Sequence, residues 1–189
     1  ALTYLTCACF NFVVVPIDRN LSDNEILNIL HESDSEAIVC SVNFVELISE
    51  KKDSLHKLKK YICMDSTTEI DFHLMTNLIE KNDPAKIDEL PKIDPNALFE
   101  IIFTSGSLGR AKGVMLSQNN LASNLVAMVQ MLMMYPEDRF LSVLPMHHTY
   151  ECTCGMLCPL YCGSSIHYSQ SLKTVVDDLT KVKATILLG

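Results

Sequence analysis

The segment from Phe103 to Ser117, FTSGSLGRAKGVMLS, carries the residues best suited to chemistry in this chain. Gly106 and Gly109 let the backbone turn where a Cβ would clash, so consecutive N–H groups can point inward at an anion. The side chains that add hydroxyl donors or positive charge are Thr104, Ser105, Ser107, Arg110 and Lys112. The segment therefore predicts a loop that binds a polyphosphate.

The spacing separates this loop from two common phosphate-binding patterns. Lys112 comes three residues after Gly109, so the adjacent Gly and Lys of the Walker pattern are absent. Gly106 and Gly109 are spaced as G-x-x-G, which is not the dinucleotide pattern G-x-G-x-x-G. A flexible turn between two strands is the alternative, but few plain turns carry this many phosphate-binding groups.

The segment resembles the phosphate-loop signature of the adenylate-forming superfamily, which includes acyl-CoA synthetases, peptide-synthetase adenylation domains and luciferases. Leu108 stands where that family usually has Thr, which removes one phosphate donor, about 1 kcal/mol if the bond was made. Ala111 stands where it usually has Pro, which loosens the loop by about 0.4–1 kcal/mol. The residues that the resemblance assigns to the ATP phosphates are Thr104, Ser105, Gly106, Ser107, Leu108, Gly109 and Lys112.

A second motif lies downstream, where Phe140–Glu151 reads FLSVLPMHHTYE. It resembles the family pattern L-P-x-x-H-x-aromatic, in the form that is most similar to long-chain fatty-acid CoA ligases. The resemblance implies that His148 and Tyr150 border the acyl and CoA pocket. A histidine pair in a loop with no ligand role is the alternative, and the phosphate loop upstream favours the functional interpretation.

The resemblance implies a longer parent enzyme that adenylates a fatty acid with ATP and transfers the acyl group to CoA. Mg²⁺ would accompany ATP, with its protein ligand outside this chain. No catalytic set is complete here, because the adenine-binding segment and the catalytic lysine of the family have no counterpart. We therefore expect a piece of the N-terminal domain that is inactive alone. A non-catalytic nucleotide- or acyl-binding relative and an enzyme for amino or aryl acids are the alternatives.

Composition excludes several other classes of protein. With 189 residues, 48% of them hydrophobic, the chain can bury a core and is not disordered. A net charge of −8 offers no basic footprint for nucleic acid. No apolar run approaches the ~18–20 residues of a membrane span, which leaves only peripheral contact with a membrane open.

Four of the eight cysteines follow one another closely, at Cys152, Cys154, Cys158 and Cys162. With His147 or His148 they suggest a metal site, but three ligands in one helical row converge poorly on a tetrahedral ion. Buried reduced thiols are the favoured interpretation, which predicts no metal site and a cytoplasmic location.

Short apolar runs alternate with helix-like stretches, which predicts an α/β fold with a mainly parallel sheet flanked by helices. We expect a first subdomain over residues 1–143, including the phosphate loop at 103–117, and a truncated second one over 144–189. The predicted strands are 12–16, 37–40, 61–64, 97–103, 114–116, 140–144, 164–168 and 184–188. The predicted helices start after Ser22, at Asn43, at 68–71 and after Ser117, and two more cover 152–161 and 172–182. Residues 81–95 are predicted to form a surface linker.

Overall fold

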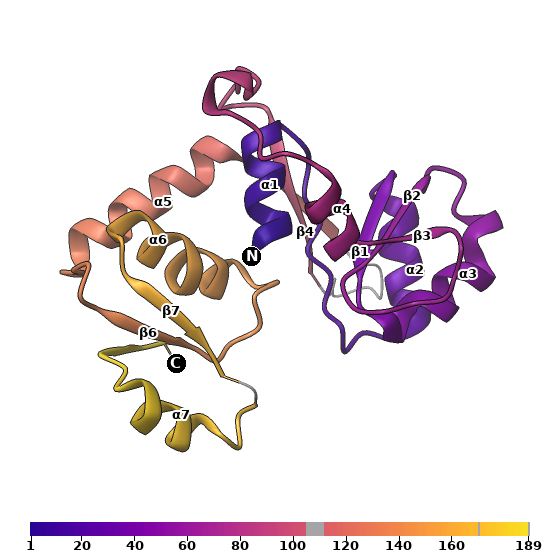
Figure 1. Ribbon diagram of the computed structural model, residues 1–189. Coiled ribbons are helices and arrows are strands. Elements are labelled where there is room, and N and C mark those ends of the chain that lie inside the picture. Colours follow the sequence, from indigo (N-terminus) through magenta and orange to yellow (C-terminus); the bar gives the residue numbers. More distant parts are fainter. Residues whose placement is uncertain (105–111, 170, 189) are drawn as a thin grey trace. The chain divides into compact units, whose positions relative to one another are not determined.

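The computed structural model describes residues 1–104, 112–169 and 171–188 (Figure 1). These residues form an α/β fold with two three-stranded sheets and one two-stranded sheet, so the predicted fold class is confirmed. The chain divides into two compact units. One is built mainly from Leu2–Ile93 and Phe103–Gly113, and the other from Asp94–Ile102 and Val114–Gly189.

The first unit holds the parallel sheet β1-β2-β3, formed by Ala37–Cys40, Lys60–Cys63 and Phe72–Leu74. Its helices are α1 (Leu2–Phe10), α2 (Asp23–Glu32), α3 (Val45–Lys51) and α4 (Met75–Lys81). The buried side chains that form its core are Ile26, Leu30, Ile38, Cys40, Val45, Ile48, Leu55, Leu58, Cys63 and Phe72. This sheet is therefore held by apolar packing against α2 and α3.

Helix α2 begins as predicted, at a capping box. The N–H and Oγ of Ser22 both donate to Oε2 of Glu25, at 2.9 and 2.6 Å. These hydrogen bonds, the side-chain one first, hold the pKa of Glu25 below its usual value. Ile26, Ile29 and Leu30 then lie on the buried face of the helix.

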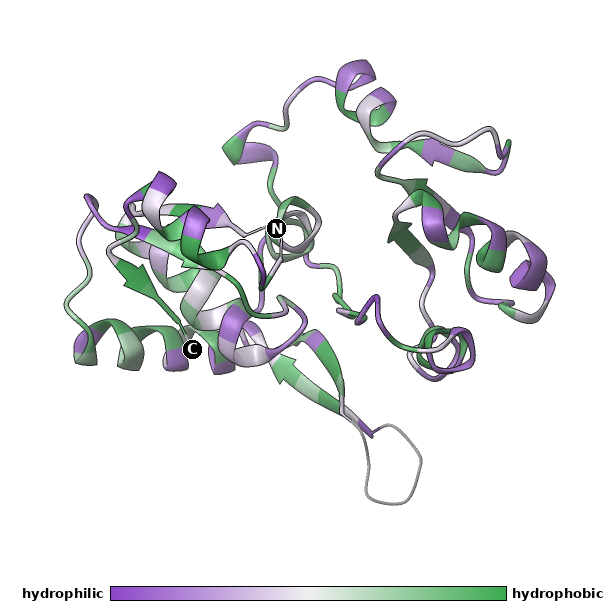
Figure 2. Ribbon diagram, turned by 90° about the horizontal axis from the view of Figure 1, so that it is seen from below, coloured by the Kyte–Doolittle hydropathy of each residue, from purple (hydrophilic) through white to green (hydrophobic). Residues whose placement is uncertain are grey.

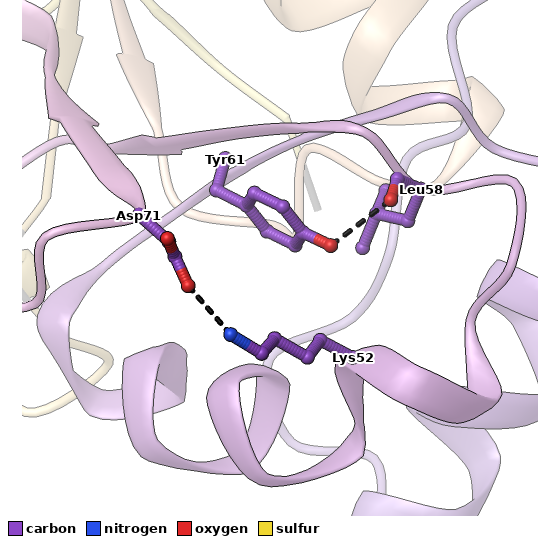
Figure 3. A network of polar contacts seen from close by, with 4 residues as sticks. All are labelled: Lys52, Leu58, Tyr61 and Asp71. Atoms are coloured by element: carbon purple, nitrogen blue, oxygen red, sulfur yellow. Dashed lines mark hydrogen bonds and ion pairs between the residues drawn. The ribbon is translucent and has the colours of Figure 1, made fainter.

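Polar contacts link the segments around β2 and β3 in the first unit (Figure 3). Lys52 Nζ lies 2.7 Å from Asp71 Oδ2, just before β3. The hydroxyl of Tyr61 in β2 donates to the carbonyl of Leu58 at 2.9 Å, and its ring lies 5.4 Å from that of Phe72. The segments before and after β2 are thereby tied to the same corner of the sheet.

The second unit holds the parallel sheet β7-β6-β8, with β6 (Arg139–Ser142) between β7 (Ser165–Tyr168) and β8 (Ile186–Leu187). A π-helix (Glu151–Leu157) runs into α6 (Cys158–Cys162), and both contact α5 (Gln118–Met131). Helix α7 (Val175–Val182) contacts β6, and Figure 1 shows α6 and α7 on opposite sides of the β6–β7 pair. The strands are largely apolar, whereas several helices carry both polar and apolar turns (Figure 2).

The third sheet pairs β4 (Leu98–Thr104) with β5 (Lys112–Ser117). Ser117 caps α5 as predicted, because its Oγ accepts from the N–H of Asn120 at 3.2 Å and its own N–H donates to Asn120 Oδ1 at 2.9 Å. The helix ends at Met131.

Three local predictions were wrong. The expected strand at 12–16 shows only an isolated bridge at Val14, and the sheet β1-β2-β3 does not include it. The helix expected to start at 68–71 begins at Met75, because Phe72–Leu74 pairs with β2 as β3. Asn43 lies inside a short 3-10 turn, and α3 starts after Phe44 instead.

The remaining elements confirm the predicted order with ends shifted by a few residues. The stretch 81–95 is mainly irregular and exposed, with one 3-10 turn at Ile87–Glu89. The subdomain boundary at residue 143 stays a prediction, although β6 before it pairs with β7 and β8 after it.

Candidate functional site

The phosphate-loop residues lie mostly outside the described residues. These are Ser105, Gly106, Ser107, Leu108 and Gly109, together with Arg110 and Ala111. Thr104 ends β4 and Lys112 begins β5, and both are exposed. The described structure thus gives a strand on each side of the loop, while the phosphate-binding roles stay predictions.

His148 and Tyr150 follow the central strand of the second sheet. Residues 143–150 leave the carboxyl end of β6, the edge where open parallel sheets bind ligands. The N–H of His148 donates to the carbonyl of Pro145 at 3.0 Å, and the carbonyl of His148 accepts from the N–H of Cys152, also at 3.0 Å. Backbone hydrogen bonds on both sides therefore hold His148 where the π-helix begins.

The side chains of this segment are accessible. The rings of His147 and His148 are 4.2 Å apart between centroids, tilted by 45°. His148 is exposed, and 48% of Tyr150 is exposed. Both predicted pocket residues are thus exposed, while their role at a pocket stays a prediction.

Glu151 is a residue of this region that neither sequence motif assigned to the site. Its side chain is 0% exposed, and Oε1 accepts a short hydrogen bond from the hydroxyl of Ser142, the last residue of β6. Gly155, one turn later, makes the space, since a Cβ there would lie 2.5 Å from Oε1 of Glu151. A Glu directly after the histidine motif and a Gly four residues later were the available signals.

The helix that carries Glu151 has a widened turn. The N–H of Cys158 donates to the carbonyl of Thr153, five residues back. Pro159 has no N–H to donate, which interrupts the ladder where the π-helix becomes α6. α6 ends at Gly163, whose φ of +76° suits a residue without a Cβ.

Burial sets the ionisation of this cluster. Desolvation raises the pKa of Glu151, and the Ser142 hydrogen bond opposes the rise only in part. Desolvation, then the nearby Glu151, raises the pKa of Cys154, and burial raises that of Cys158 to about 11. Burial, then Glu151 and Cys152, also raises the pKa of Tyr168 at the end of β7. The region therefore favours neutral acid groups and thiols.

All eight cysteines are among the described residues and are thiols rather than halves of disulfides. Cys152, Cys154 and Cys158 are buried, as predicted, while Cys162 is partly exposed. Across the part of the chain that the structure describes, no cluster of three or more His, Cys, Asp or Glu is arranged to hold a metal ion.

Comparison with known proteins decides the family. The sequence profile described as AMP-binding enzyme matches residues 1–189. The chain belongs to this family. The resemblance drawn from the phosphate loop and the histidine motif is thereby confirmed.

Two curated relatives are CoA ligases. A CoA ligase of Gibberella moniliformis is 29% identical, over 88% of this chain and 26% of that protein. The long-chain-fatty-acid–CoA ligase 5 of Rattus norvegicus is 27% identical, over 98% of this chain and 29% of that protein. The AMP-binding chain thus spans between a quarter and a third of these relatives.

A solved structure shares the fold of this AMP-binding chain. The anthranilate CoA ligase AuaEII, in complex with anthranoyl-AMP, has a TM-score of 0.88 at 16% sequence identity. The match covers 98% of this chain and 36% of that one. At this identity the likeness shows the fold alone.

Proposed function

We propose that the longer protein containing this chain is an ATP-dependent acid–CoA ligase that acts on long-chain fatty acids. The observation that carries the proposal is the pairing of the loop FTSGSLGRAKG with the motif LPMHHTYE in one chain of the AMP-binding family. The rat relative, named for long-chain fatty acids and matched over 98% of this chain, supports that substrate class.

The proposed reaction has two steps. The fatty-acid carboxylate attacks the α-phosphorus of ATP, which forms acyl-AMP and releases pyrophosphate. The CoA thiol then attacks the acyl carbonyl, forms the thioester, releases AMP and gives up its proton. Both steps depend mainly on positioning and on stabilising charge that develops in the transition state.

Two groups of residues take part in this proposal. The first group holds the β- and γ-phosphates of ATP as pyrophosphate leaves. It consists of Thr104, Ser105, Gly106, Ser107, Leu108, Gly109 and Lys112. His148 and Tyr150 border the acyl and CoA pocket. Mg²⁺ bound to ATP would offset phosphate charge, with its protein ligand outside this chain.

The proposed setting is the cytoplasm, where thiols such as Cys154 and Cys158 stay reduced. Of the helices that the structure describes, none is long and apolar enough to cross a membrane. Peripheral contact with a membrane, from which a fatty acid could be taken, belongs to the same proposal.

The test uses the full-length parent with ATP, CoA and a panel of acids. We expect AMP and acyl-CoA to form with palmitate and much less product with an aryl acid or an amino acid. A preference for either of the latter would favour the alternative substrate classes. Nucleotide binding without any acyl-adenylate would favour a non-catalytic relative, which the replacements Leu108 and Ala111 suggest.

Lys112→Ala tests the phosphate loop within that assay. Loss of one charge-assisted hydrogen bond should raise the KM for ATP or lower kcat by roughly ten- to a hundredfold. Lys92→Ala, an exposed lysine of the 81–95 stretch, is the matched control and should leave both constants unchanged. Equal constants for wild type and Lys112→Ala would contradict the assigned role.

The 189-residue chain alone should not catalyse pyrophosphate exchange with ATP and palmitate. The reason is that it has no counterpart of the family's adenine-binding segment or of its catalytic lysine. A rate near that of the parent enzyme would overturn this expectation.

A further inference from the structure

The carboxyl group of Glu151 is buried in the second unit. A fully buried carboxylate is costly unless it is paired, and within the described residues Oε2 of Glu151 has no hydrogen-bond partner while Oε1 is bound by Ser142. The neutral acid is the form that burial favours, and the raised pKa of Glu151 agrees with this. A buried carboxyl that stays neutral can hold neighbouring residues in place through a hydrogen bond without the cost of a buried charge.

The geometry shows what the carboxyl holds. Ser142 ends β6 and Glu151 begins the π-helix, so their hydrogen bond closes the segment 143–150 into a loop. That loop contains the histidine pair and Tyr150. A second tie runs from the N–H of Cys152, beside Glu151, to the carbonyl of His148. The position of His148 is therefore fixed from the strand on one side and the helix on the other.

Gly155 leaves the space that the carboxyl group of Glu151 occupies. A Cβ at Gly155 would lie 2.5 Å from Oε1 and 2.9 Å from Oε2 of Glu151, closer than nonbonded atoms approach. Gly155 is buried within a helix, where glycine costs about 1 kcal/mol against alanine. Because its φ is not in the left-handed region, the space for the carboxyl, and not the backbone conformation, accounts for the glycine.

We propose that Glu151 is a positioning residue, whose buried side chain, bound to Ser142 and housed over Gly155, fixes the loop that presents His148 and Tyr150. Its charge is not needed for this role, but its length and its hydrogen bond are. The ionisable groups around it are Cys152 and Cys154 on the same helix and Tyr168 at the end of β7. The link to catalysis rests on the proposed function, whereas the loop geometry does not.

The test measures amide hydrogen exchange in the full-length parent over peptides that contain residues 143–152. Ser142→Ala and Glu151→Ala should raise exchange there by roughly two- to tenfold, the factor that one hydrogen bond contributes. Glu151→Gln, which keeps the length and an acceptor, should restore the wild-type rate. Glu137→Ala, an exposed residue of the same unit, is the matched control, and exchange in β7 reports on opening of the whole second unit.

Gly155 supplies a second arm. Gly155→Ala should raise exchange in 143–152 when Glu151 is present, and should add nothing in the double variant Glu151→Ala with Gly155→Ala, because the clash is gone. Strict additivity of the two substitutions would overturn the proposed housing. Wild-type exchange in Ser142→Ala, or equal effects of Glu151→Gln and Glu151→Ala, would overturn the positioning role.

Activity links the loop to the proposed function. Ser142→Ala and Glu151→Ala should raise the KM for the fatty acid or CoA by roughly tenfold, since small misplacements are costly, and leave the KM for ATP unchanged. Glu151→Gln should recover the acid and CoA constants. If the parent shows no ligase activity, the proposed function fails, and the exchange pattern still decides the role of Glu151.

Discussion

The two three-stranded parallel sheets have different residues at their carboxyl ends. In the sheet β1-β2-β3 the last residues are Cys40, Cys63 and Leu74, and Cys40 lies in register with Cys63. In the sheet β7-β6-β8 the last residues are Tyr168, Ser142 and Leu187. Each edge has one aliphatic side chain, but the first adds two thiols and the second adds two hydroxyl groups.

The difference separates an edge with neutral thiols from the edge at which the proposed site lies. The carboxyl ends of parallel strands are where ligands bind in open α/β sheets, so both edges are topological candidates. At the first edge, burial, then Cys63 and Asp65, raises the pKa of Cys40 to about 11, and the thiol stays neutral and inert at pH 7. At the second, a buried carboxyl and an exposed histidine loop meet at the same strand. Polar groups at the strand ends therefore distinguish the sheet that carries the proposed site.

The largest expected effect is on the stability of the first sheet. Phe72→Ala removes a ring of β3 that is 7% exposed, and should lower the free energy of unfolding by about 3–5 kcal/mol. Ile70→Ala is the matched control, because Ile70 is 97% exposed and should change stability by less than about 0.5 kcal/mol. Denaturant unfolding measures both, with the same KM values expected in each folded variant. Equal losses at the two positions would contradict the assigned core.

The thiol edge offers a smaller effect that depends on pH. The pKa of Cys40 is about 11 in the folded chain against an ordinary 9.0. Its neutral form is favoured by folding, so its contribution to stability is complete below pH 9 and is lost as the pH rises through 11. Cys40→Ala should therefore lose less stability than wild type between pH 9 and 11, measured by thermal unfolding.

The control for that experiment is Cys9→Ala, at an exposed cysteine of α1. It should keep the alkaline loss of the wild-type protein. An identical alkaline loss in Cys40→Ala would show that other groups cause it, and the edge would no longer count as a neutral thiol edge.

Local sequence signals predicted much of this fold. The predicted helix starts after Ser22 and Ser117 are confirmed, because each serine caps its helix through a partner only three residues away, which is a local feature. The strand β1 has the predicted bounds, since a short apolar run between turn residues is a local pattern. β3 was missed because three residues are too few to show a period, and only its pairing with β2 makes Phe72–Leu74 a strand.

The candidate site was predictable in part, for the same reason. A motif places residues by type and spacing, which is sufficient to single out Lys112 and His148. The burial of Glu151 depends on where β6 ends relative to the π-helix, and no spacing in the sequence fixes that contact. Gly155 becomes informative only when the carboxyl over it is seen.

The smallest expected effect tests the helix that contacts the π-helix of the second unit. Ser117→Ala removes the cap of α5, and the N–H of Asn120 then loses its acceptor. The expected loss is about 0.5–2 kcal/mol of stability, measured by denaturant unfolding. Ser123→Ala is the matched control, since the Ser123 hydroxyl only donates to the carbonyl of Asn119 and alanine favours the helix interior.

Because α5 contacts the π-helix, Ser117→Ala should also raise amide hydrogen exchange at 143–152, but by less than Ser142→Ala. A larger rise in Ser117→Ala would mean that the loop depends on the covering helix more than on Glu151, and the distinction between the two sheet edges would then rest on packing instead of on the buried carboxyl.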